Sequence, residues 1–283
     1  MEGRAIGAIV VVALLVLGFG TWSALRWDEL KVVDTAADLS LDGDVGGQAG
    51  AQPADGPQTT TTAPGPTPTT VPPTTPVSVP LPDCAIGDDE AVGDPATDWA
   101  KIVVDANLAL PGDFAPPDLV DAEAAGFDTG DQIREIIVDD LDALRQAAED
   151  NDTPLGLVSA YRSYGYQQGL YDREVEQEGE AEAQKGTARP GHSEHQLGTS
   201  VDLLAAGSQS LVPSFAETDT GQWLAENAPT YGFVISYPDL PTTRTCYEFE
   251  PWHLRYVGRD LAPEITASGL APREWMLSHP EAP

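Results

Sequence analysis

Three of the four histidines in the chain lie in two dense polar motifs whose spacing suits a hydrolytic metal site. The first motif spans residues 190–202 and the second spans residues 248–256. A hydrolytic zinc site needs three protein ligands, an open position for water and a nearby base that does not bind the metal. The side chains that meet this need are the ligand candidates His195, Asp202 and His253, with Glu250 as the candidate base.

The residues around these candidates support the assignment. Gly198 permits a sharp turn between His195 and Asp202. Asp202 stands in an apolar segment, where a carboxylate is costly unless a partner such as a metal compensates for it. Pro251 prevents Glu250 and His253 from lying inside a helix, so we expect them to approach the metal from a turn. Each residue alone has an ordinary structural alternative, and only the joint pattern favours a metal site.

The other polar residues of the two motifs have simpler interpretations. We expect Glu194 and Glu248 to be solvated members of a very acidic surface, and His192 to support the structure. His279, near the C-terminus, is expected to be an ordinary surface or packing residue.

The pattern Ser193-x-His195-x-x-Gly198-x-x-x-Asp202, followed by Glu250-x-Trp252-His253, resembles the signature of the LAS-type zinc peptidases. Within that group the chain resembles the VanY-like D-alanyl-D-alanine carboxypeptidases of peptidase family M15, from about residue 97 to residue 257. Ala160-Tyr161-Arg162-Ser163 and Tyr231-Gly232-Phe233 belong to the same likeness. One departure is Ser236, where the family commonly has a basic residue before its Tyr-Pro pair.

The resemblance implies that one Zn²⁺ ion is bound by His195, Asp202 and His253, that a metal-bound water is the nucleophile, and that Glu250 is the general base. It also implies that Arg162 binds either the oxyanion or a substrate carboxylate; the alternative is a surface ion pair. Ser193, Gln167 and Trp252 are the implied substrate contacts, against local structural roles for each. The implied reaction is hydrolysis of the terminal D-Ala from peptidoglycan stem pentapeptides.

Other functions stay open at this stage. An L,D-carboxypeptidase, a D,D-dipeptidase or a cross-link endopeptidase acting on peptidoglycan would need the same zinc site. A non-catalytic, zinc-stabilised cell-wall binding module is the alternative outside the enzyme class, although Glu250 argues against it. An acidic surface adhesin is a third reading. The net charge of -32, from 46 acidic residues against 14 Lys and Arg, excludes direct binding to nucleic acid.

Composition divides the chain into four parts. Residues 1–28 contain the uncharged run 5–25, long enough to span a bilayer, and we expect an uncleaved transmembrane anchor rather than a cleaved secretory leader or a buried helix. Residues 29–82 form a disordered linker rich in Pro, Thr and Gly. A peptidase domain at 83–275 and a tail at 276–283 follow. We therefore expect a single-pass membrane protein, a monomer, with its domain outside the cytoplasm in the cell wall.

The pattern within the domain predicts an α+β fold, with a small antiparallel sheet flanked by helices. Helices are expected at 130–149, 164–178 and 219–227, and strands at 155–161, 199–204, 233–237 and 253–257. The two cysteines, Cys84 and Cys246, stand near the two ends of the domain, and outside the cytoplasm we expect them to form a disulfide. Two free buried thiols are the alternative.

Overall fold

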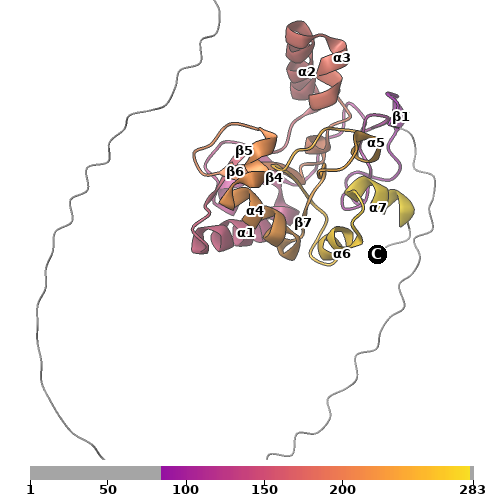
Figure 1. The fold of residues 1–283 in the computed structure, drawn as a ribbon. Helices are drawn as coiled ribbons and strands as arrows, with labels where there is room; N and C mark the ends of the chain where they lie inside the picture. The colour runs from indigo at the N-terminus through magenta and orange to yellow at the C-terminus, as the bar shows by residue number, and fades with distance from the viewer. Residues whose placement is uncertain (1–83, 281–283) are drawn as a thin grey trace, which may run out of the picture. The chain divides into compact units, whose positions relative to one another are not determined.

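The computed structural model describes residues 84–280 (Figure 1). The predicted anchor (1–28) and linker (29–82) lie outside this range. Within it, no helix is both long and apolar enough to cross a bilayer. The strands are β1 (Asp89–Glu90), β2 (Leu108–Ala109), β3 (Leu119–Asp121), β4 (Gln132–Arg134), β5 (Leu155–Ser159), β6 (Ser200–Ala205), β7 (Phe233–Ile235) and β8 (His253–Tyr256). The α-helices are α1 (Val138–Asp150), α2 (Tyr164–Glu178), α3 (Glu180–Gly186), α4 (Asp219–Asn227), α5 (Thr242–Thr245), α6 (Leu261–Ser268) and α7 (Pro272–Ser278).

The largest sheet has four strands in the order β5-β6-β8-β7, and every neighbouring pair is antiparallel. This arrangement confirms the predicted α+β class with a small antiparallel sheet. Figure 1 shows α1 and α4 close together beside the sheet, while α2 and α3 project away from it. The other two sheets have two strands each, and one of them, β1-β2, is parallel.

Helix α1 begins later than the sequence pattern predicts. Its buried residues Leu141, Leu144 and Ala148 follow helical spacing, as expected. Residues 132–137 instead form β4 and a short 3₁₀ turn, because Ile133 pairs with Val120 of β3 and is buried. The prediction of a helix from residue 130 was therefore wrong over its first two turns, since strand pairing outweighed the local helical pattern.

The remaining predicted elements match the structure closely. Helices α2 and α4 have the predicted bounds, and the four strands of the main sheet differ from prediction by no more than two residues at either end. The C-terminal helices α6 and α7 had no counterpart in the prediction. They pack a second core cluster that contains Val234, Ile265 and Trp275.

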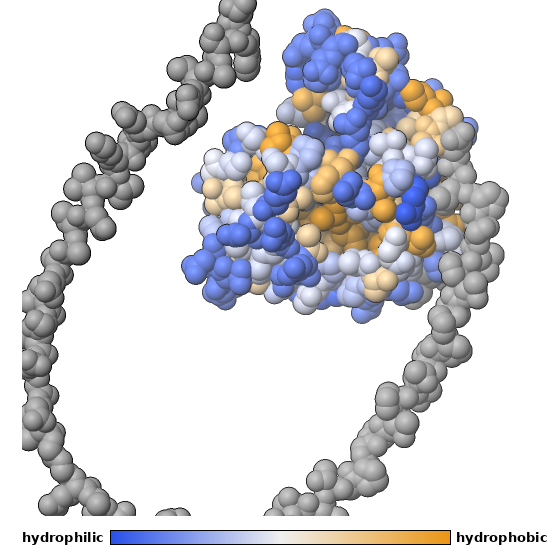
Figure 2. All heavy atoms as spheres, in the orientation of Figure 1, coloured by the Kyte–Doolittle hydropathy of each residue, from blue (hydrophilic) through white to orange (hydrophobic). Residues whose placement is uncertain are grey.

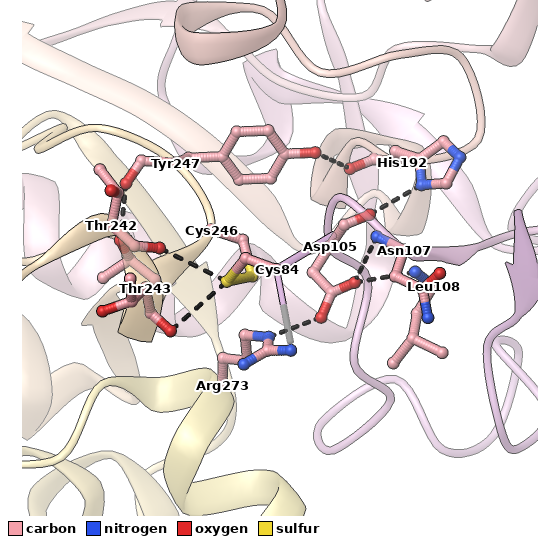
Figure 3. Close-up of a disulfide and its surroundings, with 11 residues drawn as sticks. Cys84, Asp105, Asn107, Leu108, His192, Thr242, Thr243, Cys246, Tyr247 and Arg273 are labelled. Atoms are coloured by element: carbon pink, nitrogen blue, oxygen red, sulfur yellow. Dashed lines mark hydrogen bonds and ion pairs between the residues drawn. A yellow bond between two sulfur atoms is a disulfide. The ribbon is translucent and has the colours of Figure 1, made fainter. Parts of the chain in front are cut away.

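The predicted disulfide between Cys84 and Cys246 is confirmed (Figure 3). It joins the first described residue to the segment that leads into β8, across 162 residues of sequence. Two further contacts hold the same region together. Arg273 Nε donates to Asp105 Oδ2 at 2.5 Å, and the Tyr247 hydroxyl donates to the His192 carbonyl at 3.1 Å.

Removal of this disulfide should destabilise the domain. A cross-link that closes so long a loop limits the unfolded chain, and its loss typically costs about 2–5 kcal/mol. We expect the double variant Cys84→Ser/Cys246→Ser to unfold at a clearly lower urea concentration than the oxidised protein. The matched control is the reduced wild-type chain, which should behave like the double variant. Equal unfolding midpoints for the oxidised protein and the variant would show that the cross-link contributes nothing.

Candidate metal centre

The exit from β5 fixes the position of the first candidate ligand. The register between β5 and β6 shifts between Leu157 and Ser159, and such bulges redirect the following side chains. The next carbonyl, that of Ala160, accepts a hydrogen bond from His195 Nδ1 at 2.6 Å, and Arg162 N donates to the His195 carbonyl. Gly198 follows with φ of 69°, which provides the predicted turn into β6.

The other two candidates lie directly opposite each other on neighbouring strands. Asp202 of β6 is paired with His253 of β8, and residues opposed in this way have adjacent side chains. His253 Nδ1 lies 3.2 Å from Asp202 Oδ1, and His195 Nε2 lies 3.3 Å from Asp202 Oδ2. The structure therefore brings His195, Asp202 and His253 together, with one possible ligand atom of each within 4.8 Å of the others.

The arrangement of these atoms fits a bound cation. Because His195 Nδ1 faces a carbonyl oxygen, it carries the ring proton and leaves Nε2 with a free lone pair. That buried Nε2 makes no hydrogen bond within residues 84–280, yet it faces a carboxylate oxygen. Two acceptors pointing at each other need a positive charge between them. Two imidazoles and one carboxylate form a donor set that suits zinc.

The expectation that Glu194 is a solvated surface residue was wrong. It is 5% exposed rather than solvated, and its two oxygens contact Arg255 Nη1 at 2.8 Å and His253 Nε2 at 3.0 Å. Arg255 also donates to the carbonyls of Trp99 and Ile102. A carboxylate behind a ligating histidine fixes which ring nitrogen carries the proton. Glu194 therefore leaves His253 Nδ1 as the metal-facing atom.

Burial and the neighbouring charges shift the pKa values of His195 and His253 in opposite directions. Burial, followed by the positive charge of Arg162, lowers the pKa of His195 to about 4. Burial alone would lower the pKa of His253, but hydrogen bonds to Asp202 and Glu194 outweigh it and raise that pKa to about 10. Burial alone would raise the pKa of Glu194, but Arg255 and His253 hold it at about 2. Without metal, His253 is therefore protonated at neutral pH.

Zinc binding should release this proton, so the apparent zinc affinity should rise with pH. Zinc and the proton compete for His253, which faces Asp202, Glu194, Glu250 and His195. One displaced proton corresponds to about a tenfold gain in affinity per pH unit. The gain should continue from pH 7 to pH 8, where histidines with ordinary pKa values would contribute little. Competition with a chromophoric chelator at pH 6, 7 and 8 measures this slope, and a flat response above pH 7 would contradict it.

Replacement of Glu194 should weaken zinc binding. In Glu194→Gln the carboxylate partner of His253 Nε2 is lost and Arg255 loses its buried counter-charge. Loss of such a supporting contact typically lowers metal affinity about 10- to 100-fold. The measurement is the zinc dissociation constant, with Glu176→Gln, an exposed change on α2, as the matched control. The same zinc affinity in both variants would remove Glu194 from this role.

Two of the three ligand candidates, Asp202 and His253, line a cavity of about 510 Å³. All three predicted substrate contacts line this cavity: Ser193, Gln167 and Trp252. Arg162 lines it too, and its Nη2 approaches Ser193 Oγ at 3.5 Å, while its Nε has no partner in the described part of the chain. Trp252 is 8% exposed and also packs in the main core, which agrees with a packing role, while its contact with substrate stays a prediction.

Glu250 and His192 occupy different environments. Glu250 Oε2 lies 3.7 Å from His253 Nδ1 and the side chain is 18% exposed, at the edge of the metal centre. Burial raises the pKa of Glu250 to about 7, against the opposing charge of His253. His192 faces away from the centre and contacts the Asp105 carbonyl and the Asp88 carboxylate. It therefore supports the structure, as predicted.

Comparison with known proteins agrees with this geometry. A family model described as VanY, D-alanyl-D-alanine carboxypeptidase, matches residues 130–259. A solved structure of VanYB in complex with D-alanine-D-alanine is 32% identical, with a TM-score of 0.55, and the match covers 63% of this chain and 98% of that one. The chain belongs to the VanY family. The LdcB LD-carboxypeptidase structure is also similar to this VanY chain, with 37% identity, a TM-score of 0.56, and coverage of 62% and 84%.

Curated proteins give the same relationship. A D-alanyl-D-alanine carboxypeptidase of Enterococcus faecalis is 32% identical over 188 residues, which cover 63% of this VanY chain and 66% of that protein. A bifunctional D-Ala-D-Ala dipeptidase and carboxypeptidase, VanXYC of Enterococcus gallinarum, is 31% identical over 124 residues, or 43% and 63% of the two chains. The chain spans 63–66% of the length of three such relatives.

Proposed function

We propose that this protein is a zinc-dependent D,D-carboxypeptidase that removes the terminal D-alanine from peptidoglycan stem pentapeptides. The observation that carries the proposal is the buried cluster of His195, Asp202 and His253. Two of its members, Asp202 and His253, line a cavity that Glu250 and Arg162 also line. The cluster would hold one zinc ion through His195 Nε2, an Asp202 oxygen and His253 Nδ1. Bound zinc supplies Lewis-acid polarisation and a lower pKa for coordinated water.

The remaining chemistry belongs to side chains of the cavity. Glu250 is a carboxylate beside the ligands, with Oε2 3.7 Å from His253 Nδ1, and in this proposal it accepts a proton from the attacking water and delivers it to the leaving amine. Arg162 provides a planar cation whose Nε has no hydrogen-bond partner among residues 84–280, which suits either the developing oxyanion or the terminal carboxylate. Apolar side chains of the same cavity, Leu170 and Leu211 among them, suit the methyl groups of two alanines.

The proposal includes the setting of the reaction. The uncharged run 5–25 and the Pro- and Thr-rich linker support a single-pass membrane protein whose domain acts outside the cytoplasm, within the cell wall. We propose that it acts there as a monomer on stem peptides.

A defined pair of peptides tests this function. Zinc-loaded protein should release D-alanine from a synthetic stem pentapeptide ending in D-Ala-D-Ala, and much less from the matching tetrapeptide, as mass spectrometry of the products would show. The similarity to the LdcB LD-carboxypeptidase favours L,D-cleavage of the tetrapeptide as the second candidate. Preferred cleavage of the tetrapeptide would establish that candidate instead. No cleavage of either peptide by folded, zinc-loaded protein would favour a binding module.

A further inference from the structure

One wall of the cavity carries two acids, Glu174 and Glu248, that have no role in the reaction described above. Helix α2 presents Gln167, Leu170 and Glu174 to the cavity, at the spacing of one helical face. Glu248, from the segment between Cys246 and β8, also lines the cavity. Figure 2 shows that the surface over α2 and α3 is strongly hydrophilic, next to more apolar surface below it.

These two acids lack an evident counter-charge in the cavity. A divalent ion together with Arg162 carries three positive charges, which balance Asp202, Glu250 and the terminal carboxylate of the substrate, and that leaves the charges of Glu174 and Glu248. The hydrogen bond to Glu182, and to a smaller degree the charge of Glu248, raise the pKa of Lys185. Its Nζ is already 2.7 Å from both carboxylate oxygens of Glu182, so this part of the surface keeps an excess of negative charge.

A buried acceptor on the same helix face indicates that a ligand binds here. Gln167 is 2% exposed, and its Nε2 donates to the Ala188 carbonyl at 2.7 Å. Its Oε1 has no hydrogen-bond partner in the described residues. A buried carbonyl oxygen without a partner costs free energy until a donor reaches it. An acceptor-rich wall of this kind is complementary to N–H groups and to an ammonium ion.

The dimensions fit a substrate with a carboxylate at one end and an amine further along. Helix α2 begins at Tyr164, two residues after Arg162. The helical rise places Glu174 roughly 15 Å further along the helix from Tyr164. Two residues of extended peptide span at most about 7 Å, and a long side chain that ends in an amine covers much of the remainder. In a stem pentapeptide, the residue before the two D-alanines is a diamino acid with such a side chain.

We propose that Glu174 and Glu248 form a binding site for the side-chain ammonium group of the substrate, so that the enzyme selects stem peptides whose diamino acid has a free amine. This inference rests on the carboxypeptidase function proposed above. Cross-linked or acylated stems lack this positive charge, and they are therefore poor substrates. The site gives the enzyme a preference for peptides that have not yet been joined to a neighbour.

The test uses two pentapeptides that differ only in the free or acetylated side-chain amine of a lysine at the third position. Full-length, zinc-loaded protein should release D-alanine from the free-amine peptide with a kcat/KM about tenfold higher than from the acetylated one. In Glu174→Gln/Glu248→Gln this ratio should fall to near one. The wild-type ratio should also shrink as salt is added, because exposed charges are screened.

Glu176→Gln is the matched control, because it removes one charge from an exposed position on the other side of α2. It should keep the full preference. Equal kcat/KM for the two peptides with wild-type protein would overturn the ammonium site and leave the proposed function intact. A preference that persists in the double variant would overturn the assignment to these two residues. Absence of D-alanine release from both peptides would overturn the function, and the ammonium site with it.

Discussion

Glu250→Gln should retain zinc and lose about 1,000-fold in kcat, near the middle of the range for loss of a general base. The substitution keeps the size of the side chain but removes the basic oxygen that lies beside His253. Glu250 is not one of the three clustered ligand candidates, so the metal site itself should persist. Turnover of the stem pentapeptide, measured together with zinc content by elemental analysis, separates the two effects.

Glu250→Asp is the informative companion variant. It keeps the carboxylate but withdraws it by one methylene group, so partial activity is expected if a proton-accepting oxygen is what matters. Full turnover by Glu250→Gln with zinc bound would show that another group accepts the proton. Loss of zinc from that variant would instead place Glu250 among the ligands.

Arg162→Lys should lower kcat/KM by about 100-fold, because lysine keeps the charge but loses the planar donor pair. The Ala160 carbonyl, just after β5, accepts a hydrogen bond from His195 Nδ1, and Arg162 N donates to the His195 carbonyl, so the backbone of Arg162 is fixed by the same turn as the metal site. The loss should appear mainly in kcat if Arg162 binds the oxyanion. It should appear mainly in KM if Arg162 holds the terminal carboxylate of the peptide.

The two kinetic constants therefore decide between the roles that the sequence left open for Arg162. A Ser193→Ala variant is the control, since Ser193 Oγ accepts from Arg162 Nη2 at 3.5 Å and its loss should have a smaller effect. If both kinetic constants of Arg162→Lys stayed within twofold of wild type, the residue would be a surface ion-pair member only.

The clustering of the metal-site residues could be predicted from sequence because their types and spacing already exclude most alternatives. His195, Asp202 and His253 are held by a glycine turn and by two paired strands, and both features have local sequence patterns. Glu194 could not be placed in this way. Its burial depends on Arg255, which reaches it from β8, and in so acidic a chain one more glutamate carries little information.

Two features of the sequence pointed toward Glu194 in retrospect. It stands between Ser193 and the ligand candidate His195, and Arg255 follows His253 by two positions. The alternation of side chains between the two faces of β8 does not reveal which acidic residue pairs with the buried Arg255. The later start of α1 has a similar cause, because the pairing of Ile133 with Val120 depends on a partner strand that local periodicity does not identify.

The most direct test of the account is a zinc-edge anomalous difference map from crystals of the zinc-loaded protein. The account predicts one strong peak within about 2.0–2.2 Å of His195 Nε2, an Asp202 oxygen and His253 Nδ1, with Glu250 near the ion but outside its ligand set. Absence of a peak between these three side chains, or a single peak elsewhere in the domain, would contradict the account.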